Sequence, residues 1–258
     1  MGSNKLFDLE GRTVIITGGG RGIGKVYAKS CVDAGMKVVI ADIHGEEAET
    51  TAAELRDSGG DAIAVTTDIS NEESVAAMAK KTMEAFGRID GVVNNASLMS
   101  SLPRRSWLEI PTEEWDRVMA VDLRGLLTVC RAVYPHMKAQ KCGKIINVSS
   151  SRVLEGTPNR LHYTSAKAGV IGFSRALARE VGDDGINVNV VMPGLTLSDT
   201  QLASSSTSYL SDEYNQQRAL KRPQTPEDLV GTVLFLLSPA SDFITGQTIN
   251  VDGGKSMH

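Results

Sequence analysis

Seven short runs rich in β-branched residues recur along this chain, with longer stretches of helical pattern between them, and this rhythm leaves few folds open. The runs lack alternation between polar and apolar side chains, which is typical of parallel strands covered on both faces. A regular alternation of strands and helices produces this order of elements. The predicted strands are Thr13–Thr17, Lys37–Ala41, Ala62–Thr66, Gly91–Asn94, Lys144–Val148, Ile186–Met192 and Thr248–Val251.

Helix signals fill the gaps between the predicted strands. Ser70 and Glu73 have the spacing of a capping box, and Pro226 suits the first position of another helix. A long helix is predicted to begin after Thr112 and to run to about His136. The sequence therefore predicts an α/β fold, a Rossmann-like doubly wound parallel sheet of about seven strands with helices on both faces.

A chain of 258 residues has room for two small domains or one large α/β domain. No repeat and no linker-like change of composition divides it, so residues 1–258 are predicted to form a single domain. One segment, Leu195–Arg222, is long, Ser-rich and poor in apolar residues. We expect it to form a lid at about 195–222, because loops of this length in compact domains usually have a use; a surface excursion without function is the alternative.

Charge and cysteine content exclude several classes of function. The chain has 27 basic and 31 acidic residues, a net charge of -4, and no block of Lys or Arg, so we expect no nucleic-acid partner. Cys31, Cys130 and Cys142 form no CxxC pair and have no metal-ligand spacing, which predicts no metal and a cytoplasmic location. No apolar run approaches the roughly 20 residues of a membrane span, so no membrane partner is expected.

A glycine-rich turn, TGGGRGIG at Thr17–Gly24, directly follows the first predicted strand. Gly18, Gly22 and Gly24 would let the backbone turn sharply and approach a phosphate, whose charge would then lie at the N-terminus of the next helix. A turn of this kind is weak evidence alone, because many connections between a strand and a helix need glycine.

The residue that ends the second predicted strand strengthens the case for a dinucleotide. A carboxylate at Asp42 can accept hydrogen bonds from both hydroxyls of an adenosine ribose, and it would repel a 2′-phosphate. Asp42 therefore favours NAD over NADP. Arg21 in the glycine-rich turn is the contrary signal, since an arginine there could pair with a 2′-phosphate. A helix-capping role for Asp42 is the alternative without function.

Tyr163 and Lys167 lie four residues apart in a segment of helical pattern, which places both side chains on one helix face. Several further motifs appear in order around this pair. Together they resemble the short-chain dehydrogenase/reductase family, of the one-domain type of about 250 residues, over almost the whole chain. The motifs are TGGGRGIG, NNAS at Asn94–Ser97, Ser150, YTSAK at Tyr163–Lys167, Pro193–Gly194 and the C-terminal FITGQTINVDGG.

The resemblance implies an NAD-dependent oxidoreductase that interconverts a secondary alcohol and a ketone. Tyr163 would be the general acid/base, and Lys167 would favour its phenolate and hold the nicotinamide ribose. Ser150 would hydrogen-bond the substrate oxygen. The cofactor would carry the redox chemistry itself.

The same resemblance assigns cofactor contacts along the chain and implies a homotetramer acting on a small-molecule substrate. The backbone of Ile23 would meet the pyrophosphate, and that of Thr196, after Pro193, would meet the carboxamide. The full implied NAD site comprises Gly18, Arg21, Gly22, Ile23, Gly24, Asp42, Asp68 and Ile69 beside the adenine, Asn95 beside the adenosine ribose, Tyr163, Lys167, Pro193 and Thr196.

Two positions depart from the family pattern. Ser97 replaces the glycine of NNAG, a mild change unless the backbone there needs a positive φ. Asp122 stands where the family has a fourth catalytic residue, an asparagine that helps hold a water linking the lysine to solvent. Our hypothesis is that Asp122 keeps this relay and adds negative charge near Lys167; a crippled relay and a weak enzyme is the alternative.

The substrate is less well specified than the chemistry. Ser97, Leu98 and Met99, Arg152, Val153 and Leu154, and Arg160 and His162 are expected to line the pocket, His162 as a packing residue. Arg152 and Arg160 could bind the carboxylate or sulfonate of an anionic hydroxy substrate or sugar; solvent exposure or pairing with Glu155 is the alternative. Two rival functions are a weakly catalytic nucleotide-binding regulator and a reductase of fatty-acid synthesis intermediates, the latter disfavoured by Asp42.

Overall fold

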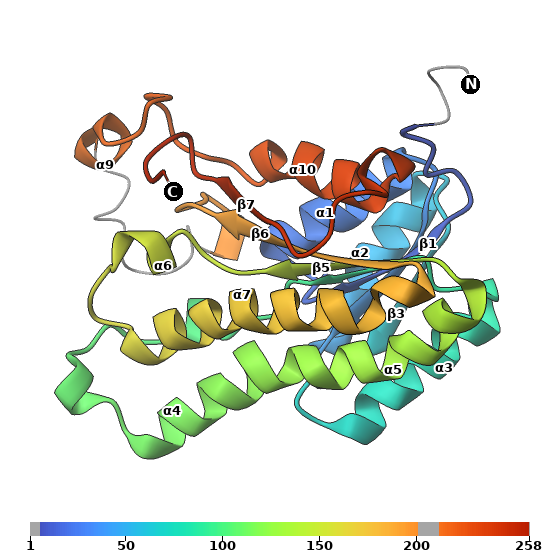
Figure 1. Cartoon of the computed structure of the whole chain (residues 1–258), viewed down its shortest axis with the longest axis horizontal. Coiled ribbons are helices and arrows are strands. Elements are labelled where there is room, and N and C mark those ends of the chain that lie inside the picture. Colours follow the sequence, from blue (N-terminus) through green and yellow to red (C-terminus); the bar gives the residue numbers. More distant parts are fainter. Residues whose placement is uncertain (1–5, 201–211, 258) are drawn as a thin grey trace.

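A twisted sheet of seven parallel strands runs through the middle of the molecule (Figure 1). The computed structural model describes residues 6–200 and 212–257. The strand order is β3-β2-β1-β4-β5-β6-β7, so the chain moves outward from β1 in one direction and then returns to continue from β4 in the other. The strands are β1 Thr13–Thr17, β2 Lys37–Asp42, β3 Ala62–Thr66, β4 Gly91–Asn94, β5 Gly143–Val148, β6 Ile186–Pro193 and β7 Thr248–Val251.

Helices cover both faces of this sheet (Figure 1). One layer contains α1, α2 and α10, whose apolar residues join one core cluster, and the other contains α3, α5 and α7, which join a second. The helices are α1 Gly22–Asp33, α2 Gly45–Asp57, α3 Glu72–Phe86, α4 Thr112–Met119, α5 Gly125–Gln140, α6 Arg152–Glu155, α7 Leu161–Val181, α9 Asp212–Gln216 and α10 Glu227–Leu237. The predicted doubly wound α/β architecture is confirmed.

Burial explains why the central strands show no polar alternation. Every residue of β1 and of β5 is buried, because helices lie against both faces of the sheet there. The edge strand β7 is different, since all four of its residues are only half-buried. The predicted bounds of β1, β3, β4 and β7 agree with the structure, and β2, β5 and β6 are each one residue longer than predicted.

The capping box predicted at Ser70 and Glu73 is wrong. Helix α3 begins at Glu72, so its cap is Asn71, whose side-chain oxygen accepts a hydrogen bond from Ser74 N at 2.9 Å. Ser70 lies one residue too early, and its hydroxyl donates to Asp68 Oδ1 at 2.7 Å instead. Asparagine caps helices as well as serine does, so two adjacent cap-forming residues left the position ambiguous.

The long helix predicted from Thr112 to His136 is composite. Helix α4 passes into a π-helical segment, Ala120–Arg124, which continues as α5 to Gln140. The helical course therefore ends four residues later than predicted. π-Helical segments often occur at functional sites, and this one carries the buried Asp122.

Candidate active site

A cavity of about 860 Å³ opens at the carboxyl ends of the strands, beside the point between β1 and β4 where the strand order reverses. Open α/β sheets bind ligands at such a point, and the volume suits a cofactor together with a small substrate. The predicted site residues that line it are Gly18, Arg21, Gly22, Ile23, Asp42, Asp68, Ile69, Asn95, Ser150, Arg152, Arg160, Tyr163, Lys167, Pro193 and Thr196. Two predicted site residues, Gly24 and Asp122, lie outside the lining.

The glycine-rich turn has the backbone shape that its sequence predicts. Gly18 and Gly22 line the cavity with φ values of 63° and 60°, which favour glycine. Gly24 does not line the cavity, and a Cβ there would lie 2.0 Å from the carbonyl oxygen of Gly18. Gly24 thus permits close packing of α1 against the turn, whereas Gly18 and Gly22 line the cavity itself.

The N-terminus of α1 is suited to an anion. Arg21 is its N-cap, with an extended backbone and no side-chain capping bond, and the first turn holds no acidic residue. The first amide groups of a helix lack partners within the helix and carry partial positive charge. These features fit the pyrophosphate of a dinucleotide.

Asp42 is buried at the end of β2 and held in place by the backbone. Its Oδ2 accepts a hydrogen bond from Gly20 N at 3.0 Å, and its Oδ1 accepts one from His44 N at 3.0 Å. Arg21, the contrary signal for cofactor choice, lies 3.4 Å from Glu47 Oε1, and both side chains are largely exposed. The fixed charge at this end of the cavity is therefore a carboxylate.

Asn95 lines the cavity and also closes the turn. Its Nδ2 donates to the carbonyl oxygens of Thr17 at 3.1 Å and Gly18 at 3.2 Å. Asn95 therefore has a structural function, in addition to the contact with the adenosine ribose that the sequence predicts. Asp68 and Ile69, after β3, and Pro193 and Thr196, at the end of β6, border the same cavity.

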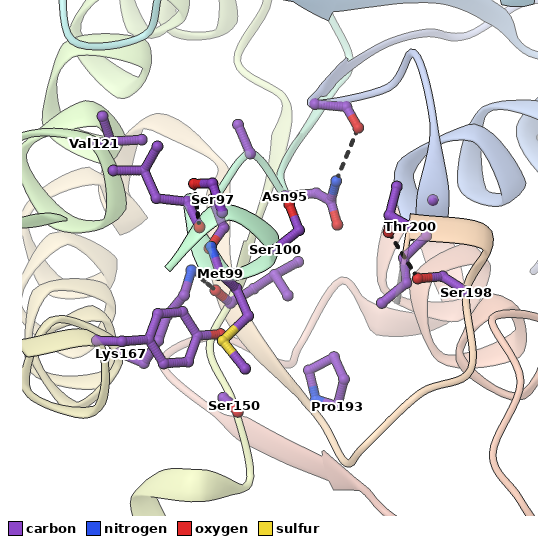
Figure 2. Close-up of a pocket in the computed structure, with 18 of the residues that line it drawn as sticks. Asn95, Ser97, Met99, Ser100, Val121, Ser150, Lys167, Pro193, Ser198 and Thr200 are labelled. Carbon is purple, nitrogen blue, oxygen red and sulfur yellow. Dashed lines mark hydrogen bonds between the residues drawn. The ribbon is translucent and has the colours of Figure 1, made fainter. Parts of the chain in front are cut away.

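Helix α7 brings Tyr163 and Lys167 to the cavity, one turn apart and both buried. Lys167 Nζ donates to Val148 O at 3.0 Å and lies 5.7 Å from the centre of the Tyr163 ring. Ser150, just after β5, lies near the Tyr163 hydroxyl and lowers its pKa. Figure 2 shows Ser150 and Lys167 facing the same pocket.

The pKa of Tyr163 is raised from its ordinary value, chiefly because burial penalises the phenolate. Lys167, the nearby Ser150 and the charge of Arg152 oppose this rise, whereas the charge of Asp122 adds to it. The lowering that we expected from Lys167 is therefore present, but burial outweighs it in the protein alone.

The two departures from the family pattern contact each other. Ser97 Oγ donates to Asp122 Oδ1 at 2.5 Å, and Leu98 N donates to Oδ2 at 3.1 Å. The same Oδ1 lies 3.2 Å from Lys167 Nζ, in an ion pair whose two side chains are buried. Lys167 thus has a direct carboxylate partner. Ser97 lacks a positive φ, so the prediction that its replacement of glycine is mild is confirmed.

The predicted substrate residues divide into two groups. Ser97, Leu98, Met99, Arg152 and Arg160 line the cavity, but Val153 and Leu154 do not. Val153 packs on a small apolar cluster, and Leu154 is turned to solvent. His162 is buried, with its Nε2 3.1 Å from Glu114 Oε1, as expected of a packing residue.

Several cavity residues escaped the sequence analysis. Arg104 comes from the loop after β4, and Lys255 comes from the C-terminal segment and forms an ion pair with Glu155. Within the predicted lid, Leu195, Ser198, Thr200 and Tyr214 line the cavity, whereas residues 201–211 lie outside the described residues. No local motif marks Arg104 or Lys255, and only the fold brings them to the cavity.

Residues 6–200 and 212–257 contain no group of three or more His, Cys, Asp or Glu side chains that could hold a metal ion. Within the same ranges, no helix combines the length and apolar character that crossing a membrane requires.

Comparisons with known proteins extend over nearly the whole chain. Residues 18–256 match a family model described as enoyl-(acyl carrier protein) reductase. The chain is 38% identical over 252 residues to a 3-oxoacyl-[acyl-carrier-protein] reductase of Synechocystis sp., covering 96% of this chain and 98% of that relative.

Solved structures also match nearly the whole chain. A 3-ketoacyl-(acyl-carrier-protein) reductase from Brucella melitensis, complexed with NADH, superposes with a TM-score of 0.88 at 32% identity, covering 96% of this chain and all of that one. A putative NAD(P)-dependent gluconate 5-dehydrogenase from Beutenbergia cavernae, with NADP bound at low occupancy, gives 0.87 at 32% identity, with coverages of 97% and 98%. The matched family model, the relative and both structures, together with the geometry of the cavity, show that this chain belongs to the short-chain dehydrogenase/reductase family of oxidoreductases.

Proposed function

We propose that this protein interconverts a secondary alcohol and a ketone, with NAD as cofactor and Tyr163 as general acid/base. The observation that carries the proposal is the convergence of Ser150, Tyr163 and Lys167 on a single cavity whose far end suits a dinucleotide. When bound, the nicotinamide would supply or accept the hydride. Gly18, Gly22, Ile23 and Asp42 would hold the cofactor on the residues described above.

During alcohol oxidation, Tyr163 would take the hydroxyl proton and Ser150 would donate a hydrogen bond to the substrate oxygen. Lys167, close to the ring of Tyr163, would stabilise the phenolate needed for this step. The positive charge of the oxidised nicotinamide would act in the same direction. In ketone reduction, Tyr163 would return the proton.

Asp122 would tune this proton transfer. Its carboxylate contacts Lys167 directly and offsets part of the ammonium charge that favours the phenolate. We propose that Asp122 keeps Lys167 within the proton relay, held by the hydrogen bonds from Ser97 and Leu98. Asp122 would therefore act as a positioning residue with its own effect on pH dependence.

The test of the general acid/base is Tyr163→Phe, assayed on a panel of secondary alcohols and hydroxy acids with NAD. We expect turnover to fall by at least about 100-fold, because general acid–base catalysis contributes roughly 10²–10⁴-fold. NAD binding, measured by calorimetry, should change by less than about threefold. Equal turnover in the variant would overturn the role of Tyr163, and an inactive native protein that binds NAD would favour the nucleotide-binding regulator.

NAD preference is supported by the fixed carboxylate of Asp42 at the ribose end of the cavity. Replacement by Asp42→Ala removes both the ribose acceptor and the charge that would repel a 2′-phosphate. We expect the ratio of kcat/KM for NAD to that for NADP to fall by at least about tenfold, a change of roughly 1.4 kcal/mol. Asp57→Ala, an exposed carboxylate outside the cavity, is the matched control. A ratio that stays constant in Asp42→Ala would contradict the assignment.

A second candidate is the reduction of 3-oxoacyl thioesters, because the Synechocystis relative bears that name at 38% identity. This function was disfavoured above on the strength of Asp42 alone. Reduction of acetoacetyl-N-acetylcysteamine with NADH and with NADPH separates the two. Efficient reduction of this thioester with NADPH, together with no oxidation of free hydroxy acids by NAD, would favour the thioester function.

A further inference from the structure

The substrate end of the cavity has an unbalanced positive charge. We propose that the substrate carries a carboxylate a few bonds from its carbinol carbon, and that Arg152 and Arg160 bind this carboxylate. The inference rests on the proposed alcohol–ketone chemistry and names its substrate class.

Both arginines are placed beside the reacting groups by neighbouring elements. Arg152 is the first residue of α6, and its backbone nitrogen donates to Ser150 Oγ at 3.4 Å. Arg160 immediately precedes α7, which carries Tyr163 one turn later. Both side chains line the cavity, and the positive charge of each interacts electrostatically with the Tyr163 hydroxyl. An anion between them would therefore lie close to the carbinol.

Neutral acceptors hold the two guanidinium groups in place. Arg152 Nη2 donates to Thr157 O at 3.0 Å and to Pro158 O at 2.9 Å. Arg160 Nη2 donates to Leu102 O at 2.7 Å, and its Nη1 lies 3.4 Å from Met99 Sδ.

These contacts leave donors available. Nε of Arg152 and Nε of Arg160 are buried and have no hydrogen-bond partner among the described residues. Nη1 of Arg152 also has no hydrogen-bond partner among the described residues and, unlike Nε, it is not buried. The guanidinium groups are thus oriented without being neutralised, and Arg152 keeps donors that a ligand in the cavity can reach.

The carboxylates at this end of the cavity are already paired with other cations. Asp122 pairs with Lys167, and Glu155 pairs with Lys255. Across residues 6–200 and 212–257, no carboxylate oxygen lies within 4.0 Å of Arg152 or Arg160. The alternative that these arginines pair with Glu155 is therefore wrong, since Lys255 takes that place.

The pKa values of both arginines are lowered, chiefly by burial. Burial, followed by the charges of Arg104 and Arg152, lowers the pKa of Arg160 to about 10. Burial also lowers the pKa of Arg152, although the nearby Tyr163, Glu155 and Tyr214 oppose this. Cations that are partly desolvated and repel one another gain the most from a bound anion. The planar fork of a guanidinium matches a carboxylate in particular.

A purely structural explanation is that the two arginines only hold loops in place through their hydrogen bonds to backbone carbonyls. Glutamine could form a similar neutral tether, so the charge itself would then have no function. The experiment must therefore separate charge from hydrogen bonding, and it must not depend on one guessed substrate.

The test uses three matched pairs of probes, in which the carboxylate lies one, two or three bonds from the carbinol carbon. They are lactate, 3-hydroxybutyrate and 4-hydroxypentanoate, each compared with its primary amide, at saturating NAD. We expect at least one acid to exceed its amide by at least tenfold in kcat/KM. In Arg160→Gln and Arg152→Gln this ratio should fall by at least fivefold, and in Arg160→Lys it should largely return.

Arg105→Gln is the matched control, because Arg105 lies in the same region, pairs with Glu114 and does not line the cavity. Its acid-to-amide ratio should equal that of the native protein. Folding of each variant is checked by its affinity for NAD. Amides that equal or exceed all three acids, or a ratio unchanged in both Gln variants, would overturn the inference while leaving the alcohol–ketone chemistry intact.

Equilibrium binding separates this inference from failure of the proposed function. The ketones pyruvate, acetoacetate and 4-oxopentanoate do not react in the NAD⁺ complex, so calorimetry measures their binding without turnover. We expect one of them to bind at least tenfold more tightly than its amide, and we expect Arg160→Gln to abolish that difference. An absent difference in all three pairs would overturn the anion site, whether or not the enzyme turns over any alcohol.

Discussion

At the residue scale, position 122 shows how one atom-for-atom replacement alters a site without altering its shape. A carboxylate lies where the family pattern has an amide, completely buried and 3.2 Å from the ammonium of Lys167. Ser97, the other departure, supplies a hydroxyl donor to the same carboxylate. Because the two positions are in contact, we expect their effects to be non-additive.

Changing Asp122 to Asn should shift the pH dependence of alcohol oxidation toward lower pH. The pKa of Tyr163 is raised first by burial, and Asp122 adds to that rise while Lys167 and Arg152 oppose it. Removing the negative charge therefore lowers the pKa of Tyr163, and the rate, which needs the phenolate, should begin to rise at lower pH. The measurement is kcat against pH for the native protein and Asp122→Asn.

Ser97→Gly serves as the companion variant, because it removes a hydrogen bond and leaves the carboxylate charge in place. Its pH profile should move less than that of Asp122→Asn. Superimposable profiles for the native protein and Asp122→Asn would show that the carboxylate has no electrostatic function.

The positions of the motif residues at the cavity were predictable from the sequence because each occupies a fixed place in a short pattern. Asp42 follows from its position at a strand end, and Tyr163 and Lys167 follow from helical spacing. Arg104 and Lys255 were missed, since they reach the cavity from segments that show no pattern. The direct contact between Ser97 and Asp122 also required the fold, because the two residues are 25 positions apart.

At the scale of the element, the strands were the most predictable part of the molecule. Strands buried on both faces have little choice but apolar, β-branched residues, so their sequence marks them clearly. Helix ends were harder, because several residue types form caps with similar stability. The π-helical segment Ala120–Arg124 has no sequence signature that we recognised, although it carries Asp122.

The cap of α3 offers a direct test at this scale. Asn71→Ala removes the side-chain acceptor for Ser74 N and should destabilise the protein by about 1 kcal/mol. Glu73→Gln should cost less than about 0.5 kcal/mol, because the exposed Glu73 is not part of a capping box. Urea unfolding followed by circular dichroism measures both. Equal losses in the free energy of unfolding in the two variants would support the capping box that the sequence predicts and contradict the specific role of Asn71.

At the scale of the whole molecule, the β7 edge of the sheet is suited to association with another protein surface. Strand β7 is the last in the sheet, its four residues are half-buried, and Phe243 close by in the sequence is fully exposed. An edge strand without charged residues is prone to association unless another surface covers it. The family resemblance suggests that further copies of this chain provide that surface.

We therefore expect a homotetramer in solution. Light scattering coupled to gel filtration should give a mass about four times that of the 27.6 kDa chain. Phe243→Asp, which places a charge near this edge, should lower the measured mass or make it depend on concentration. A native protein that remains a monomer at micromolar concentration would contradict the expectation.

The ion pair between Lys255 and Glu155 ties the segment that follows β7 to helix α6, which begins with Arg152. Loss of the Lys255 side chain alone, as in Lys255→Ala, would leave Glu155 without a cationic partner close to Arg152. We expect such a variant to keep its fold, because Lys255 lies outside the sheet and both core clusters, and to change its preference between charged and neutral substrates.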